Sequence, residues 1–318
     1  MAGAARTLAG MDRAKVLLQW TWQFIKDIGG EWSKDRVGGM SAEIAFFALL
    51  GFFPALIVLA AALGSADGLL GEANATEIEE WFVEQMTDIF GGENSLGETV
   101  KDLFSGANTG AFTVGALLAV YAASRGFVAV VGALDVAYDH EQNRGWLSTR
   151  LVGFGLTLLT VLVAAVVLTL VVVGPLFGGG GELAEDLGVD GWFTVLWTWF
   201  RWPIVFAMLV AWAASVYHIA PNHRSPWRSE LPGAALASVW WTAVSLGFGQ
   251  YLEAASSGAN AVFGLLGGAL SLLFWLYLMA MGLLLGAEVN SVMAGRRGIL
   301  IESEPRRPLS EIASRWRR

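Results

Sequence analysis

Six long apolar runs constrain the fold more than any other feature of this chain. Each run can cross the hydrocarbon core of a bilayer, which takes about 20 residues at a helical rise of about 1.5 Å per residue. Four of the runs contain no charged residue, and the other two contain one arginine each. Soluble core helices would carry a polar face, and barrel strands need only about 10 alternating residues, so the pattern predicts membrane-spanning helices. The runs are residues 44–64, 110–134, 151–177, 191–217, 231–252 and 261–287.

The composition agrees with a chain that is solvated mainly by lipid. Hydrophobic residues make up 55% of the sequence and charged residues 15%, whereas soluble domains carry about 25% charged residues. The chain has no cysteine, which excludes a disulfide framework and a thiolate metal site. Its three histidines form no recognisable ligand motif, and no phosphate-binding loop of an ATPase is present. We therefore predict an all-α integral membrane protein that needs neither a metal nor another cofactor.

The basic residues outside the runs predict the orientation of the chain. Alternate connecting segments hold seventeen Lys and Arg on one side and one on the other, and positive segments stay in the cytoplasm. Six spans then place both termini there. Residues 1–43 are predicted to be a cytoplasmic N-terminal segment, 44–287 the transmembrane domain and 288–318 a basic cytoplasmic tail. The outer loop 65–109 is acidic, with ten Asp or Glu.

Short amphipathic helices are expected outside the spans. Residues 11–28 carry apolar side chains at helical spacing with lysines off the stripe, so this helix either lies on anionic lipid at the inner leaflet or packs on the bundle. Two more short helices are predicted in the loop 65–109, where Thr76 and Ser95 begin capping boxes. The acidic faces of these two helices are most simply solvated surfaces.

Prolines and glycines interrupt the apolar runs. Pro54, Pro175 and Pro203 can each break or kink a helix, either as part of a transport site or as a packing feature. The glycines of the sixth run predict close helix contact, within one chain or between the protomers of a homo-oligomer. These glycines are Gly264, Gly267, Gly268, Gly282 and Gly286.

Two arginines lie inside the runs. Arg125 is residue 16 of a 25-residue run, and a charge at that depth costs about 2.5–3.5 kcal/mol on insertion scales. We expect its side chain to face the bundle interior or a cavity; the structural alternative is an arginine that caps carbonyls or pairs with Glu43 or Glu288. Arg201 follows a tryptophan-rich stretch that is typical of the membrane interface, so it is expected to snorkel there; if the span instead begins at Gly191, Arg201 lies deeper.

Several motifs resemble those of one bacterial family. The first run reads SAEIAFFALLGFFPALIVL, the second contains the pair Ser124-Arg125 with Arg144 downstream, and Asn222 closes a Tyr-x-x-Ala-Pro-Asn pattern. The last run reads VFGLLGGALSLLFWLYLMAMGLLLGAEVN. Over roughly residues 38–293 the chain is similar to the YihY/BrkB group of inner-membrane proteins. The resemblance implies six membrane helices and a transport or envelope role, although the family has also carried a ribonuclease label. Asp135 and Phe263 depart from its usual Asn and Tyr.

The working hypothesis is a transporter, or a lipid or envelope translocator, whose buried arginine serves an anionic substrate or a proton-coupled carboxylate. The alternative is a non-transporting scaffold that recruits envelope proteins through its tails. Expected partners are the bilayer and anionic lipid at the basic termini, with no nucleic acid, because metal-assisted nucleases need clustered carboxylates or His ligands that the sequence does not offer. The candidate residues of a transport or buried-charge site are Arg125, Ser124, Glu43, Glu288, Asp135 and Asn290.

Overall fold

Every regular element in the described part of the chain is a helix. The computed structural model describes residues 19–64, 109–139, 144–168, 192–222, 225–256 and 261–296. A first helix covers residues 19–34 and is followed by a turn at 35–36. The later elements are α2 (Val37–Gly64), α6 (Thr109–Ala137), α7 (Trp146–Leu168), α10 (Trp192–Ile219), the short 3-10 helix η3 (Trp227–Glu230), α11 (Leu231–Ser256) and α12 (Ala261–Arg296). The all-α prediction is therefore confirmed for these residues.

Four segments of these helices are long and apolar enough to cross a membrane. They are Trp146–Ala164, Trp199–Ile219, Trp227–Tyr251 and Gly267–Arg296, and Val37–Phe52 is a shorter apolar helix. Large apolar side chains point outward from the bundle, among them Leu158, Leu162 and Leu246. A helix that is apolar on its outer face as well as its inner face belongs in lipid. The number of crossings, six in our reading of the sequence, stays a prediction.

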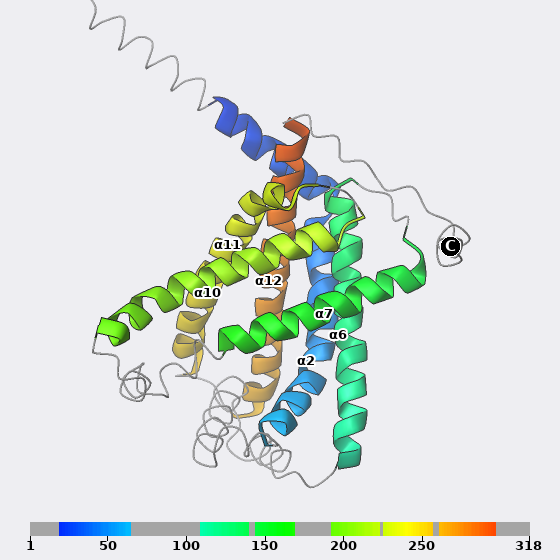
Figure 1. Ribbon diagram of the computed structural model, residues 1–318, viewed down its shortest axis with the longest axis vertical. Coiled ribbons are helices and arrows are strands. Elements are labelled where there is room, and N and C mark those ends of the chain that lie inside the picture. The colour runs from blue at the N-terminus through cyan, green and yellow to red at the C-terminus, as the bar shows by residue number, and fades with distance from the viewer. Residues whose placement is uncertain are drawn as a thin grey trace, which may run out of the picture.

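The helices form two groups that cross each other (Figure 1). In the view of Figure 1, α2, α6 and α12 run upright, and α2 packs against both α6 and α12 while α11 packs along α12. Helices α7 and α10 run obliquely across this group and contact each other, with α6 beside α7 and α11 beside α10. Hydrogen bonds and ion pairs join the end of α6, the end of α10 and the start of α11 to the last turns of α12 and to the N-terminal helix that leads into α2. We call this end of the bundle the polar end.

The core near the polar end is built from small side chains. Ala214, Ala234 and Ala287 are fully buried. A methyl carbon added to Gly286 would lie 2.5 Å from the carbonyl oxygen of Gly233 and 2.3 Å from the hydroxyl of Tyr217. Backbones can approach this closely only where side chains are small, as in many membrane helix pairs. This contact joins α11 to α12 at the level where the charged residues begin.

The other glycines of α12 have different surroundings. A methyl carbon at Gly282 would lie 2.2 Å from the Trp240 ring of α11, whereas Gly267 has nothing within 4 Å. Gly268 is buried. The side chains around Gly264 lie outside the described residues.

Helices α2 and α12 extend beyond the apolar runs at the polar end. The first run begins at residue 44, but α2 begins at Val37; the last run ends at 287, but α12 continues to Arg296. The charges of Glu43 and Glu288 end the apolar runs, but glutamate is a good helix former, so the backbone stays helical through both positions. The helices are therefore longer than the apolar runs here, and the bounds of the membrane-spanning parts stay a prediction.

Other predictions can be placed only in part. Helix α2 runs through Pro54 and α10 through Pro203, whereas Pro175 lies outside the described residues. The N-terminal helix is present from residue 19 and continues past 28 to 34. Its expected first turns and the loop 65–109, with its two short helices, also lie outside the described residues.

Candidate functional site

A charged cavity of about 410 Å³ lies between α2, α6 and the start of α7 near the polar end. Four charged residues line it, two of each sign: Glu43, Arg125, Asp135 and Arg144. The rest of the wall is mostly apolar, with Met40, Phe47, Val128, Val131 and Val136 among its members. Pockets that take small molecules usually measure about 300–1,000 Å³ and combine an apolar lining with a few polar groups. This cavity has the size of a small polar molecule or a lipid headgroup.

Helical spacing explains why these side chains share the cavity. On α2 the wall residues are Met40, Glu43 and Phe47, which lie on one helix face. On α6 the wall begins at Arg125 and ends at Val136, a length of about 16 Å at 1.5 Å per residue. The cavity therefore follows the contact between the two helices from the interior toward the polar end.

Arg125 forms the inner end of the cavity. Its guanidinium carbon lies 5.0 Å from the centroid of the Phe47 ring, within the range of a cation–π contact. Arg125 makes no hydrogen bond or ion pair with any of the described residues, and so it pairs with neither Glu43 nor Glu288. The cation is thus held against an aromatic face and remains available to an anion.

Arg144 holds the end of α10. Its guanidinium donates hydrogen bonds to the carbonyl oxygens of Ala220 at 2.7 Å and Pro221 at 3.0 Å, and to Oδ1 of Asn222 at 3.3 Å. The last carbonyls of a helix need such donors because they have no partner inside the helix. The Ala-Pro-Asn segment is therefore the place where α10 docks on the segment that leads into α7.

Asp135 serves the same junction. Its carboxylate is buried, and Oδ1 accepts a hydrogen bond of 3.0 Å from the backbone N–H of Asn222. Asp135 and Arg144 thus line the cavity and also hold the segment that follows α10. The remaining two charges, Arg125 and Glu43, have no such partner among the described residues.

Ser124 lies beside Arg125 in sequence but does not line the cavity. It is buried, and its hydroxyl oxygen accepts a hydrogen bond of 3.3 Å from Arg150 of α7. The Arg150 guanidinium also lies over the rings of Tyr121, at 5.3 Å, and Trp146, at 5.9 Å. Ser124 therefore helps to hold α7 against α6.

Asn290 belongs to a buried polar network. Its side-chain N–H groups donate to Oε2 of Glu230 at 3.0 Å and to the carbonyl oxygen of Glu230 at 3.1 Å, and its Oδ1 accepts from the N–H of Gly233 at 2.7 Å. The hydroxyl of Tyr138 donates to the same carboxylate, and Ser225 donates to its other oxygen. The network joins the end of α6, the start of α11 and α12. Sequence reasoning missed Tyr138 and Glu230, since neither lies in an apolar run.

Glu288 is buried on a different side of α12. Neither of its carboxylate oxygens has a hydrogen bond of good geometry among the described residues, although its carboxyl lies close to that of Asp35. Burial raises the pKa of Asp35, and the ammonium group of Lys34 opposes the rise in that pKa. The structure therefore does not bring Glu288 or Asn290 to the cavity that Arg125 lines. Within the described residues, no three His, Asp or Glu side chains come together as a metal site.

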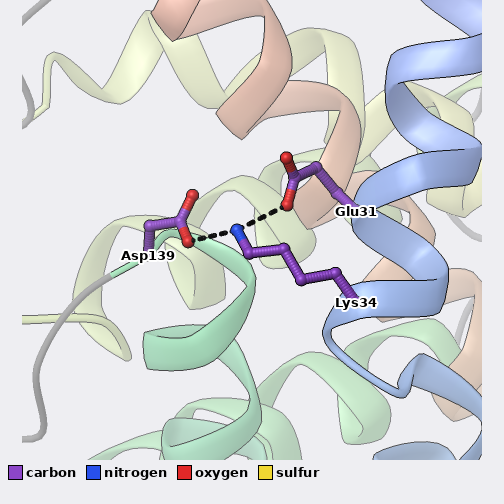
Figure 2. Close-up of polar contacts among 3 residues, drawn as sticks. All are labelled: Glu31, Lys34 and Asp139. Atoms are coloured by element: carbon purple, nitrogen blue, oxygen red, sulfur yellow. Dashed lines mark hydrogen bonds and ion pairs between the residues drawn. The ribbon is translucent and has the colours of Figure 1, made fainter.

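An ion-pair clamp joins the N-terminal helix to α6 (Figure 2). The ammonium nitrogen of Lys34 lies 2.8 Å from Oε2 of Glu31 and 2.8 Å from Oδ1 of Asp139. These two hydrogen bonds, that to Asp139 above all, raise the pKa of Lys34. The groups are largely exposed, so the pair stabilises the fold by about 1 kcal/mol at most.

A second contact fixes the same helix to the last turn of α12. Arg296 forms an ion pair with Asp27 at 2.5 Å, and its guanidinium lies over the rings of Trp20 and Phe24, at 5.1 Å from each. Trp22 and Ile25 of this helix remain exposed. The helix is therefore attached to the bundle at one side and keeps apolar side chains on its surface.

Arg201 lies ten residues into α10, away from the cavity. Its guanidinium carbon lies 5.4 Å from the Trp202 ring, and its Nε is buried without a hydrogen-bond partner among the described residues. That it snorkels to the membrane interface stays a prediction.

Comparison with known proteins places this architecture in a family. The family model described as "Virulence factor BrkB" matches residues 28–310. The chain is 31% identical to the ribonuclease-like protein YfkH of Bacillus subtilis (strain 168) over 281 residues, which are 86% of this chain and 96% of that protein. It is also 37% identical to a UPF0761 membrane protein of Stenotrophomonas maltophilia (strain K279a), over 26% of this chain and 19% of that protein. No solved structure matches. With a family match over most of its length and helices that are apolar enough to cross a bilayer, the chain belongs to the BrkB virulence factor family and is a membrane protein.

Proposed function

We propose that this protein is a multi-pass translocator of the bacterial inner membrane that moves a substrate with an anionic group. The observation that carries the proposal is Arg125, a cation on the wall of a cavity that has no acidic partner among the described residues. Both termini lie in the cytoplasm, and the cavity receives the substrate from that side.

The energetics of Arg125 support a ligand-binding role. It lies 12 residues before the end of α6, a depth of about 18 Å along the helix. A cation buried in hydrocarbon at such depth would cost about 2.5–3.5 kcal/mol, but the side chain of Arg125 is exposed on the cavity wall. The cation–π contact with Phe47 holds the guanidinium there and leaves it open to an entering anion.

The distribution of charge supports the orientation. The segments that carry the seventeen basic residues are joined in sequence to the helix ends that meet at the polar end; there the N-terminal helix and the last turn of α12 meet through Asp27 and Arg296. Positive segments remain cytoplasmic, so the cavity opens toward the cytoplasmic leaflet. The exposed Trp22 and Ile25 and the basic termini suit contact with anionic lipid there.

We propose no enzymatic activity for the chain. The ribonuclease-like name belongs to the Bacillus subtilis relative. In this chain the cavity offers two carboxylates, and Asp135 already holds the backbone of Asn222. Metal-assisted phosphodiester cleavage needs carboxylates that are free to hold the metal ions.

A transport screen in liposomes tests the proposal. Purified protein is reconstituted and assayed for uptake of ions and small anions and for scrambling of labelled phospholipids. Arg125→Gln should abolish the flux of the active substrate while the protein still inserts and purifies as a monodisperse species. Arg201→Gln is the matched control, because Arg201 is also an arginine within a long apolar helix but does not line the cavity. Flux that survives in Arg125→Gln would refute the role of the cavity.

A further inference from the structure

Arg125 shares the cavity wall with an acid that is equally available. Glu43 lines the same cavity, and among the described residues it makes no ion pair or hydrogen bond. The two opposite charges therefore face one cavity while their nitrogen and oxygen atoms stay more than 4.0 Å apart, the limit for an ion pair. A site that served only an anion would gain nothing from this carboxylate.

The two charges have a fixed order along the cavity. Phe47, the ring under the Arg125 guanidinium, is one helical turn after Glu43 on α2. Glu43 is therefore about 6 Å nearer the polar end than Phe47, at 1.5 Å per residue. The cationic group of the protein lies deeper, and the anionic group lies nearer the cytoplasmic side.

We propose that the substrate is a zwitterion in which an anionic phosphate or carboxylate is joined to an amine. The anionic group binds Arg125, and the ammonium group binds Glu43. This inference rests on the proposed function and names the substrate class of the same cavity. A phosphodiester with an aminoalkyl arm has the required pair of charges, either as a lipid headgroup or as a soluble molecule.

The order of the charges favours a headgroup from the cytoplasmic leaflet. In such a lipid the amine points to the cytoplasm, the phosphate lies deeper, and the acyl chains extend toward the bilayer centre. The cavity volume of about 410 Å³ accommodates a headgroup, so the chains of a bound lipid would remain in the bilayer. Arg144 and Asp135 shape the rest of the wall and keep their contacts to the end of α10.

Binding of two matched probes to the full chain in detergent tests the inference. The probes are glycerophosphoethanolamine and glycerophosphoglycerol, which share the phosphodiester and differ in the amine. We expect the wild-type protein to bind the ethanolamine probe about tenfold tighter, the effect of one charge-assisted contact. Glu43→Gln should bring the two affinities together, Glu43→Lys should reverse the preference, and Arg125→Gln should lose both probes. Asp27→Asn is the control, because Asp27 pairs with Arg296 outside the cavity.

Nanodiscs separate the two sources of the headgroup. If phosphatidylethanolamine nanodiscs weaken binding of the soluble ethanolamine probe and phosphatidylglycerol nanodiscs do not, the lipid is the ligand; if neither has an effect, the ligand is a soluble zwitterion. Equal affinity of the wild type for both probes, or a preference that survives in a monodisperse Glu43→Gln protein, would overturn the inference. If both probes bound with equal affinity and binding still required Arg125, the anion site would stand and only the ammonium site would be refuted. If the ethanolamine probe bound selectively but the protein showed no flux in liposomes, only the proposed translocation would be refuted.

Discussion

The hydroxyl of Tyr138 donates a hydrogen bond of 2.5 Å to Oε2 of Glu230 and so ties the end of α6 to the start of α11. The two side chains are 3% and 2% exposed. Hydrogen-bond donors offset the cost of burying this carboxylate, and Asn290 and Ser225 supply the others. The polar end is thus held together by specific hydrogen bonds where apolar packing gives way to charge.

Tyr138→Phe should destabilise the protein by about 1–3 kcal/mol, because it removes a donor from a buried charged acceptor and leaves the rest of the ring in place. The unfolding free energy in mixed detergent and SDS micelles measures the effect. Tyr121→Phe serves as the control: Tyr121 is 58% exposed, so its change should stay within about 0.5 kcal/mol. Equal losses in the two variants would show that the bond to Glu230 contributes nothing.

Arg144→Ala should lower stability by about 1.5–3 kcal/mol, since it removes charge-assisted hydrogen bonds to the carbonyls of Ala220 and Pro221, directly after α10. Arg144→Lys should not restore it, because a single ammonium cannot reproduce the planar fork that reaches Ala220, Pro221 and Asn222 together. The same unfolding assay compares both with Arg228→Ala, which alters an exposed arginine of η3. A fully stable lysine variant would contradict the capping role.

Gly286→Ala should destabilise the α11–α12 contact by about 1–3 kcal/mol or more, because its methyl group would overlap backbone of Gly233 and the Tyr217 hydroxyl. Gly247→Ala, on an open face of α11 with nothing within 4 Å, should instead gain up to about 1 kcal/mol from helix propensity. Thermal unfolding in detergent should therefore show a loss of stability for Gly286→Ala and a gain for Gly247→Ala. If both variants changed stability in the same direction, α11 and α12 would not approach each other as described.

Asp35 makes stability depend on pH at the junction between the N-terminal helix and α2. Burial raises the pKa of its carboxyl, so the folded protein holds the proton more tightly and its stability falls as pH rises from the ordinary Asp range through the raised pKa. Asp35→Asn should therefore be more stable than wild type at neutral pH, with a difference that disappears in acid.

A second variant checks the sign of this effect. The ammonium of Lys34 lowers the pKa of Asp35, as does the neighbouring Glu288, whereas the charges of Asp139 and Glu31 raise that pKa. Lys34→Met should therefore steepen the loss of stability with rising pH. Thermal unfolding across a pH series measures both variants, and a Lys34→Met profile that is flatter than wild type would count against this assignment.

The helices themselves could be predicted because hydropathy reports them directly. The runs that begin at residues 231 and 261 match the first residues of α11 and α12. Hydropathy does not report the helical turns beyond the apolar runs at the polar end, where α2 and α12 carry glutamates and continue for several residues.

Most of the polar contacts could not be predicted because they join residues that are far apart in sequence. Tyr138 and Glu230 are 92 positions apart, and Asn290 is another 60 from Glu230. No periodic pattern links such positions. The depth of Arg125 within a run did mark it as a candidate, but its availability and the position of Glu43 on the same wall depend on how α2 packs against α6.

Accessibility of the cavity tests the central claim most directly, and the absence of cysteine in the chain makes the measurement simple. Ala129→Cys places a thiol on the cavity wall, and Ala213→Cys places one in the closed core. With a membrane-impermeant maleimide, we expect Ala129→Cys to be labelled in inverted inner-membrane vesicles, and to lose that labelling when the active substrate is added, while Ala213→Cys stays unlabelled. Labelling of Ala129→Cys only from the periplasmic face, or from neither face, would contradict a cytoplasm-facing substrate cavity.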